Sequence, residues 1–455
     1  MKRIGVAQAS LFAVVAMLSV RWLAVAAAAG VSSLPLWLLA FALFHIPLSL
    51  AIAELTSRFP GDASLYGWVR GVLGPRAGFL CGWAYWLALF PYFASLIYFV
   101  AGLAVSATGS DRDPALFLAI SIALVVALTA VQLFGLGASR WLTSAGAAGA
   151  WIVVGLFFAA AAVVVARGDS ATRFADGPWL ATPSAGTAIL WSTMVFGVCG
   201  GETIGFLRGH IAGGMRGVVR ALAVVAAMLF VAYVAGTAAV LAILRPQDVT
   251  HLSGLPDTIR AALAQAGLDA LGTVGVALFA ASMIGALAAW FGIAPRLPME
   301  AGLDRFLPPV FARRHPRTGA PVAAILLQAV LTLGVVVLGQ AGETAEVAYD
   351  LLVQLSVLTV AIPYLLVFVA YARRSRWAQR AGDGDVWLPP GGATTGRVAA
   401  AVGIAANVAA IACTLVPEPG APHPIATLLK IAGTAAVAMV VGLVLYELRR
   451  APAPA

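Results

Sequence analysis

Long apolar runs recur along the whole chain and alternate with short polar segments. The region 4–53 carries one charge, Arg21, and the segment GVSSLP at 30–35 divides it into two runs. Further uncharged runs occur at 77–110, 114–139, 141–166, 177–201, 221–244, 270–295, 318–342, 351–372 and 398–417, and a last run at 425–446 contains Lys430. About 20 helical residues cross the roughly 30 Å of bilayer hydrocarbon. The pattern therefore predicts twelve transmembrane helices.

The composition of the chain supports helices in a lipid bilayer. The chain is 62% hydrophobic and 10% charged, and its mean hydropathy of +0.96 lies far above that of a soluble globular domain. The apolar runs lack the alternation of apolar and polar residues that marks the strands of a membrane barrel. We expect an all-α integral membrane protein. We expect no cleaved leader either, because the first run is long and continues directly into a second span.

The lysines and arginines are distributed unevenly between the two sides of the predicted membrane. With a cytoplasmic N-terminus, 21 of the 28 fall in cytoplasmic segments and 6 in external ones, and Arg21 alone lies within a span. Positive residues concentrate in cytoplasmic loops, so both termini are predicted to be cytoplasmic, with the protein in the inner or plasma membrane. Anionic headgroups account for the net charge of +9. No nucleic-acid partner is expected, because the basic residues are spread over many segments.

Enzyme signatures are sparse in this sequence. HExxH, GxSxG and Walker motifs are absent. The three cysteines and five histidines show no spacing typical of disulfides or of a metal site. Two Asp-x-Asp triplets, at 111–113 and 383–385, would suit a metal-dependent transferase, but they fall on opposite sides of the predicted membrane. We expect no enzyme activity, cofactor or metal, and a membrane-embedded transferase is the alternative.

A few polar side chains lie deep within the predicted spans. The main ones are Ser19, Arg21, His45, Glu54, Gln132, Glu202, Gln354 and Asn407. Ionisable residues inside a bilayer are costly, and by default they face a cavity or a partner. Such residues in a bundle of many spans favour a transport function.

Four sequence blocks in a fixed order resemble the amino acid-polyamine-organocation (APC) transporter superfamily, and within it the glutamate/GABA antiporter-like branch. The first block is similar to the S-[IV]-R-N-L-P motif of the first span, and the third to the F-x-F-x-G-x-E motif of the sixth. Arg296, in the fourth block, is similar to an eighth-span arginine that secures the inner loop. The blocks are SVRWLA at 19–24, FHIPLSLAIAELTSRFPGDASLYGWVRGVLGPRAGFLCGW at 44–83, FGVCGGETIG at 196–205, and ALAAWFGIAPRLPMEAGLDRFLPPVFARRHPRTGAPVAA at 286–324.

The resemblance implies the LeuT-type architecture, which has two inverted repeats of five helices and two accessory helices. Its first and sixth spans are interrupted at mid-membrane, and the freed backbone groups and half-helix dipoles bind the carboxylate and amino group of a substrate. The expected divisions are a first repeat at 1–166, an external loop at 167–176, a second repeat at 177–372, a cytoplasmic loop at 373–397, and accessory helices with a short tail at 398–455.

The stretch MVFGVCGGETIG at 194–205 places the carboxylate of Glu202 among glycines. Gly197, Gly201 and Gly205 form overlapping GxxxG patterns, which are typical of a closely packed helix face. Gly200 beside Gly201 instead allows a backbone break. One interpretation is a broken helix at 197–201 that lines the substrate site, where Glu202 orients a substrate ammonium or carries a coupling proton. The other interpretation is helix packing alone.

The first span has neither glycine nor proline between Gly5 and Gly30, so an interruption there rests on the resemblance alone. The resemblance places Ser19, Arg21 and Trp22 at the substrate site. Arg21 offers a bidentate guanidinium to a substrate carboxylate. The alternative for Arg21 is an internal ion pair, for which Glu202 is the candidate partner.

Two further residues are candidates for the transport pathway. Glu54, at the cytoplasmic end of the second span, suits gating or interhelical pairing, and the alternative is a solvated helix end. Trp290 in the eighth span is predicted to contact the substrate. Together with Trp83 and Trp86 it would shape the vestibule, although tryptophans within spans also serve packing.

These features predict a secondary active transporter for an amino acid or a related amine that works by alternating access. Both proton-coupled symport and substrate/product exchange fit the sequence. Sodium coupling is less expected, since Ser282 is the only hydroxyl between Val274 and Pro295. A non-transporting sensor on the same fold is a further alternative. The expected partners are the substrate, the lipid bilayer and, for symport, protons, in a monomer or homodimer.

Overall fold

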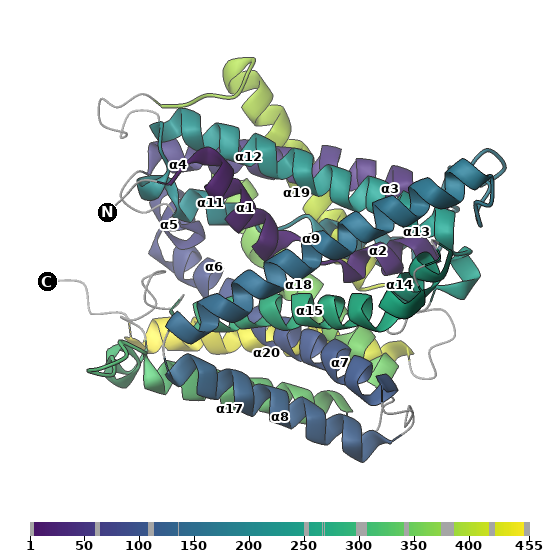
Figure 1. The fold of residues 1–455 in the computed structure, drawn as a ribbon. Coiled ribbons are helices and arrows are strands. Elements are labelled where there is room, and N and C mark those ends of the chain that lie inside the picture. Colours follow the sequence, from purple (N-terminus) through teal and green to yellow (C-terminus); the bar gives the residue numbers. More distant parts are fainter. Residues whose placement is uncertain are drawn as a thin grey trace, which may run out of the picture.

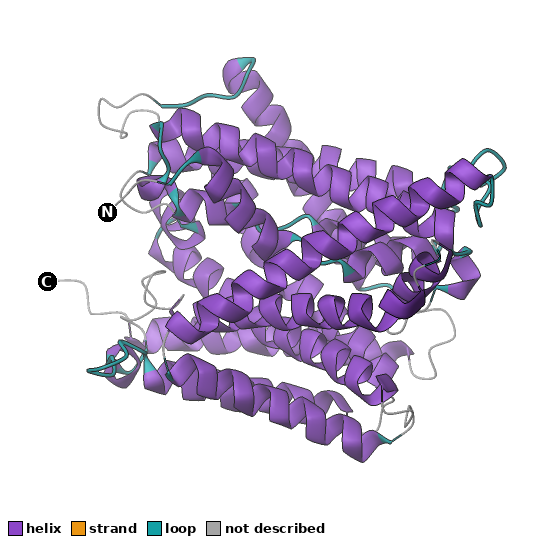
Figure 2. Cartoon of the chain, viewed as in Figure 1, coloured by secondary structure: helices purple, strands orange, loops and turns teal. Residues whose placement is uncertain are grey.

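The structure is a computed structural model of the chain. It describes residues 4–59, 64–107, 113–134, 136–249, 254–265, 267, 269–296, 307–340, 345–374, 386–417 and 424–449. The secondary structure of these residues is helical, and their one β-type contact is an isolated parallel pairing of Ile4 with Ile211 (Figure 2).

The first half of the chain supplies five membrane spans and one short helix, α5 (Leu65–Leu73), between the second and third spans. The second span contains a π-helical turn, Phe41–His45, between its two helices. The spans are α1 (Val6–Met17) with α2 (Arg21–Ala28), α3 (Ser33–Ala40) with α4 (Ile46–Arg58), α6 (Pro75–Leu87) with α7 (Leu89–Ala107), α8 (Pro114–Leu133), and α9 (Leu136–Arg167).

The second half supplies seven spans, and α14 (Gly254–Gln265) connects the seventh to the eighth. The seventh span contains a second π-helical turn, Val231–Ala235. The spans are α10 (Ala185–Gly197) with α11 (Glu202–Phe206), α12 (Gly214–Phe230) with α13 (Gly236–Ile243), α15 (Gly272–Ile293), α17 (Val322–Gln340), α18 (Ala345–Ala372), α19 (Gly392–Thr414) and α20 (Pro424–Arg449).

The predicted fold class is confirmed. Among the described residues, eleven helices are long and apolar enough to cross a membrane, and the bent pair of α1 and α2 makes a twelfth span. Each predicted apolar run overlaps one of these spans. The proposed division into repeats, loops and accessory helices stays a prediction.

The third, sixth and tenth spans form the centre of the bundle. In the apolar 18-residue stretches of these three spans, 83%, 72% and 67% of the residues are buried. In the corresponding stretch of the twelfth span, α20, 17% are buried. In the outer part of the bundle α8 and α17 lie side by side (Figure 1). Exposed apolar residues on such helices suit contact with lipid, where every backbone group is already satisfied within its helix.

Small residues allow a close helix contact between α9 and α15. A Cβ atom on Gly146 would lie 2.5 Å from the Cα atom of Gly285, so no larger residue fits without moving a helix. Close approach through glycines is a common source of helix association in membranes.

The start of α1 and the end of α20 lie at the same end of the bundle (Figure 1). We call the membrane side at this end the N-terminal side, and the other the opposite side. α1 therefore runs away from the N-terminal side, and α10, the first half of the sixth span, runs toward it.

Candidate substrate-binding site

The first span is interrupted between α1 and α2, which are bent by 56°. Side chains from other spans take up the freed backbone groups. The indole N–H of Trp290 donates to the carbonyl of Ala16 at 2.8 Å. The hydroxyl of Tyr233 accepts from the N–H of Ser19 and lies within hydrogen-bond distance of the carbonyl of Met17, both at 3.2 Å. The interruption implied by the resemblance is therefore present, without a local glycine or proline.

The sixth span is interrupted between α10 and α11, where residues 198–201 are not helical. Gly200 has a φ of +109°, a conformation that favours glycine. Its N–H donates to the hydroxyl of Tyr364 at 3.1 Å. The carbonyl of Val198 lies 2.8 Å from Nδ1 of His45. The predicted break is confirmed, and again side chains from other spans bind the freed backbone groups.

The glycines around this break also pack closely against neighbouring helices. A Cβ atom on Gly205 would lie 3.0 Å from the Trp68 ring, and one on Gly201 would lie 3.3 Å from Ile52. The interpretation of packing alone is therefore wrong, because the break is present, but Gly201 and Gly205 do pack closely against neighbouring helices.

Tyr233 connects the two interruptions. Its hydroxyl lies 3.1 Å from the carbonyl of Gly197, in addition to its contacts with Met17 and Ser19. The ring is stacked on Trp37, with centroids 4.5 Å apart. A tyrosine within an apolar run was the only sequence signal for this residue, and the sequence prediction omitted it.

The carboxylate of Glu202 is the first side chain of α11 and is buried, with 1% of the residue exposed. The hydroxyl of Tyr85, from α6, donates to its Oε1 atom at 2.7 Å. The hydroxyl of Tyr364, from α18, lies 2.9 and 3.0 Å from the two carboxylate oxygens. Glu202 is thus held by neutral donors from the third and tenth spans, and both tyrosines were absent from the sequence prediction.

Arg21 begins α2 and is also 1% exposed. One terminal nitrogen donates to Ser95 Oγ at 3.2 Å, and the guanidinium lies 4.1 Å from the centroid of the Trp22 ring. Nε and the second terminal nitrogen have no hydrogen-bond partner among the described residues, and the ring centroid of Tyr349 lies 5.9 Å from the guanidinium. Within the described part of the chain, no acidic side chain forms an ion pair with Arg21. The alternative ion pair with Glu202 is therefore not formed in this structure.

A cavity of about 70 Å³ lies between the two interruptions. Six of the eight predicted substrate-binding residues line it, namely Ser19, Trp22, Gly197, Gly200, Glu202 and Trp290. The other two do not line it. Arg21 lies beside it, with its guanidinium 5.5 Å from the ring centroid of the lining residue Tyr92, and Gly201 faces Ile52. We call this space the central cavity.

A second cavity, of about 510 Å³, lies toward the opposite side of the membrane. It is lined by the C-terminal half of α2, the start of α10 and the first half of α18, including Asp350 and Gln354. Trp22 lines both cavities, and its ring meets that of Phe196 edge to face, with centroids 5.9 Å apart. We call this space the outer cavity. Trp83 and Trp86 line neither cavity, and the Trp83 indole donates to the Ala438 carbonyl in α20.

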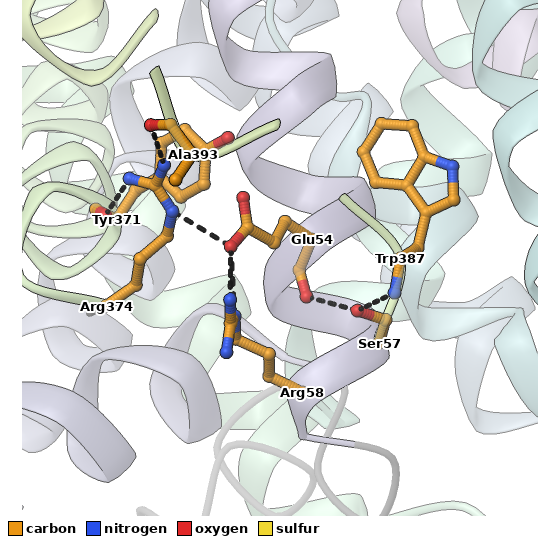
Figure 3. A network of polar contacts seen from close by, with 7 residues as sticks. All are labelled: Glu54, Ser57, Arg58, Tyr371, Arg374, Trp387 and Ala393. Atoms are coloured by element: carbon orange, nitrogen blue, oxygen red, sulfur yellow. Dashed lines mark hydrogen bonds and ion pairs between the residues drawn. The ribbon is translucent and has the colours of Figure 1, made fainter. Parts of the chain in front are cut away.

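Glu54 lies at the N-terminal side in a network of charged groups (Figure 3). It is fully buried, and its Oε1 atom accepts from Arg58 at 2.7 and 3.0 Å and from Nε of Arg374 at 2.8 Å. Arg374 also donates to the carbonyls of Tyr371 and Ala393, so the network joins the second, tenth and eleventh spans. The alternative of a solvated helix end is wrong, and interhelical pairing is confirmed.

Backbone pairing also joins elements at the N-terminal side of the bundle. Ile4, just before α1, donates to the carbonyl of His210 at 2.8 Å and accepts from the N–H of Ala212 at 2.9 Å. Arg208 donates to the carbonyl of Thr56. These contacts tie the start of the first span to the segment after α11 and to the end of the second span.

Several residues weighed for other functions have a structural role or lie outside the described residues. Oδ1 of Asp113 accepts from the N–H groups of Ala115 and Leu116 and caps α8. Asp111, Asp383 and Asp385 are outside the described residues, as is the side chain of Arg296.

Two interrupted helices around a buried cavity, within a twelve-span bundle, define a multi-span membrane protein of the transporter class. The chain belongs to the amino acid permease family, whose sequence model matches residues 4–444. The resemblance to the APC superfamily is thereby confirmed.

Similar proteins carry transporter names. The chain is 24% identical to the "Uncharacterized transporter lpg1691" of Legionella pneumophila over 90% of this chain and 88% of that protein. It is 22% identical to the "Glutamate/gamma-aminobutyrate antiporter" of Lactococcus lactis, over 72% of this chain and 67% of that protein. It is 21% identical to the "Probable agmatine/putrescine antiporter AguD" of Lactococcus lactis, over 76% of this chain and 74% of that protein.

Proposed function

We propose that the protein is a secondary active transporter that moves an amino acid or a related amine by alternating access. The observation that carries this proposal is that both helix interruptions meet at one buried cavity, with a carboxylate in its wall and an unpaired guanidinium beside it. Interrupted helices of this kind offer freed backbone groups and half-helix dipoles to the charged ends of a substrate. The names of the two Lactococcus lactis relatives support the same substrate class.

In this proposal Arg21 binds the carboxylate of the substrate. A buried guanidinium with two unpartnered nitrogens carries a desolvation cost that a bound carboxylate would offset. A guanidinium also offers two parallel N–H donors, which match a carboxylate. The neighbouring ring of Trp22 stabilises the cation when no substrate is bound.

Glu202 is proposed to act at the other end of the site. It binds the substrate ammonium or carries a coupling proton, and its two tyrosine partners hold the carboxylate in either case. Ionisable groups within membrane spans commonly mark substrate and proton pathways. The first role predicts that substrate affinity depends on the carboxylate of Glu202. The second role predicts proton-coupled symport. Substrate exchange is compatible with both roles.

Sodium coupling receives no support from the ends of the half-helices. The carbonyls of Ala16 and Met17 at the end of α1 would suit a cation, but they lie against donors from Trp290 and Tyr233. At the end of α10, Gly197 lies against the same tyrosine and Val198 against His45. Side chains therefore contact each of these oxygens, although the single hydroxyl proton of Tyr233 serves either Met17 or Gly197. Because of these contacts, we propose that transport is independent of sodium.

The conformation is proposed to be open toward the opposite side. The Glu54 network and the backbone contacts of Ile4 close the N-terminal side, whereas the outer cavity reaches toward the other. If the N-terminus is cytoplasmic, as the distribution of positive charge indicates, this state faces outward and the protein lies in the plasma or inner membrane. Glu54 is then an inner gate, because inward opening requires its ion pairs to separate.

Exchange in proteoliposomes tests this function. Vesicles containing the purified protein and loaded with a mixture of amino acids and amines should take up labelled substrate from the same mixture. A matched control is Gly200→Val, because valine does not tolerate a φ of +109° and its Cβ would lie 2.8 Å from Met17. Ligand-induced thermal stabilisation without any flux would support a sensor instead. The absence of both flux and stabilisation would contradict the proposal.

A further inference from the structure

We infer that the central cavity selects a small zwitterion whose side chain carries no charge, such as alanine or serine. This inference rests on the proposed function and names the substrate class of the same site. It follows from the charges at the two interruptions, from the unpartnered donors between them, and from the walls and size of the cavity.

The charges around the central cavity match a molecule with one positive and one negative end. Among the described residues that line it, Glu202 is the one carboxylate, and Arg21 is a cation beside it. No ion pair joins the two residues among the described contacts. Each side chain can therefore pair with the oppositely charged end of a ligand. Asp350 lines the outer cavity and not the central one.

Unpartnered donors at the first interruption are available to the carboxylate of such a ligand. Nε and one terminal nitrogen of Arg21 and the hydroxyl of Ser19 are buried without a hydrogen-bond partner among the described residues. Ser19 is 5% exposed and lines the central cavity. A carboxylate accepts about four hydrogen bonds, so one bound carboxylate suffices for these donors.

The remaining wall contains the polar groups of Tyr85, Tyr92, Tyr364 and Cys199 but, among the described residues, no further charged side chain. Met17, Ala88, Leu89 and Val360 supply aliphatic surface, and Phe196 supplies an aromatic face. The carboxylate of a glutamate side chain or the guanidinium of agmatine would be buried here without an opposite charge, which is strongly unfavourable. The selectivity therefore differs from that stated in the names of the two Lactococcus lactis relatives.

The size of the cavity also favours a small substrate. Its volume of about 70 Å³ is well below the roughly 300–1,000 Å³ of common drug-sized ligand pockets. Room of this order suits a ligand of few non-hydrogen atoms. Aromatic amino acids would require Trp22 or Phe196 to move, because both rings line the central cavity and pack edge to face against each other.

Competition in proteoliposomes tests this selectivity. Vesicles loaded with alanine should exchange it for labelled alanine, and external alanine, serine, glutamate, GABA, agmatine and alanine amide should be added as competitors. We expect alanine and serine to compete at least tenfold more strongly than glutamate, agmatine or the amide. Stronger competition by glutamate or agmatine would overturn the inference and leave the transport function standing. Absence of both exchange and ligand-induced stabilisation for every compound would instead contradict the proposed function.

A cavity variant tests the role of the aliphatic wall. Val360→Ala removes two methyl groups from the central cavity and should raise the ratio of leucine to alanine transport severalfold, because pocket volume limits the side chain. Val357→Ala is the matched control. It removes the same groups from the same helix. Both valines line a neighbouring cavity beside Phe44 and Asn407, but only Val360 also lines the central cavity. An equal change of the ratio in both variants would overturn the assignment of Val360 to the side-chain wall.

Discussion

The hydroxyl of Tyr364 lies 2.9 and 3.0 Å from the two carboxylate oxygens of Glu202, and the same hydroxyl accepts the N–H of Gly200 at 3.1 Å. One side chain of the tenth span thereby joins the buried carboxylate to the interrupted backbone of the sixth. A change in the charge or the ligand of Glu202 alters the hydrogen bonds of a group that also holds the break.

Loss of the Tyr364 hydroxyl should remove the hydrogen bonds that connect the Glu202 carboxylate to the interrupted backbone at Gly200. Tyr364→Phe should lower the rate of exchange at least tenfold while the protein stays folded, because Gly200 and Glu202 both lose a buried partner. Exchange rates and thermal stability should be measured together. Tyr98→Phe is the control, since Tyr98 donates to the Val336 carbonyl in α17, outside the site. Equal rate losses in the two variants would contradict a specific role for Tyr364.

The variant Glu202→Gln separates the two roles proposed for Glu202. Glutamine keeps the shape and some hydrogen bonds of the side chain but cannot change its charge. If Glu202 carries the coupling proton, the variant should still exchange substrate, but should lose accumulation driven by an imposed proton gradient and lose the pH dependence of exchange. If Glu202 binds the substrate ammonium, affinity should fall in both assays. Unchanged accumulation together with unchanged affinity would exclude both roles.

The variant Arg21→Lys tests carboxylate binding at the first interruption. Lysine keeps the positive charge but loses the paired donors of the guanidinium. Binding of amino acids should therefore weaken far more than binding of the corresponding decarboxylated amines, as measured by competition for exchange. Equal losses for the two ligand classes would indicate that Arg21 acts only within the protein.

The variant Glu54→Gln should open the N-terminal side. It leaves the buried guanidinium of Arg374 without its anion, and removing one partner of a buried pair costs about 3–5 kcal/mol. The native thiol of Cys199 lines the central cavity and reports on the opening. In a Cys413→Ala background, a membrane-impermeant maleimide added at the N-terminal side should label Cys199 faster in the variant.

The control for this experiment is Asp257→Asn, which removes one partner of an exposed ion pair with Arg260. Exposed pairs contribute at most about 1 kcal/mol, so labelling of Cys199 should not change. A lower melting temperature of Glu54→Gln without faster labelling would mean that the Glu54 network stabilises the fold and is not a gate.

The orientation of the chain is tested with reporters. A reporter fused after Arg380 should be cytoplasmic, and one inserted in the loop 167–176 should be external, because the arginine-rich segments are predicted to stay inside. A reporter active only in the cytoplasm and one active only outside should be used at both positions. The reversed pattern would overturn the orientation and place the outer cavity on the cytoplasmic side.

The candidate site was predictable from the sequence only in part. The sequence indicated Glu202, Arg21 and the break at 198–201, because a charge within an apolar run and two adjacent glycines within a span are rare and can be recognised from the local sequence. Tyr85, Tyr233 and Tyr364 were not, because a tyrosine in an apolar span is ordinary until its hydroxyl has a partner. Each of the hydrogen bonds from Tyr85 and Tyr364 to Glu202 joins residues more than 100 positions apart.

By itself, the sequence determined the number of spans and the fold class, because the free energy of placing a helix in lipid depends mainly on the composition of that one segment. Only the tertiary structure decided where the first span breaks. That break has no glycine or proline, and it exists because Trp290 and Tyr233, from distant spans, bind the backbone groups that a continuous helix would use itself. Only the tertiary structure, too, gave Glu202 neutral partners and left Arg21 without an anion, since these pairings depend on which helices are neighbours.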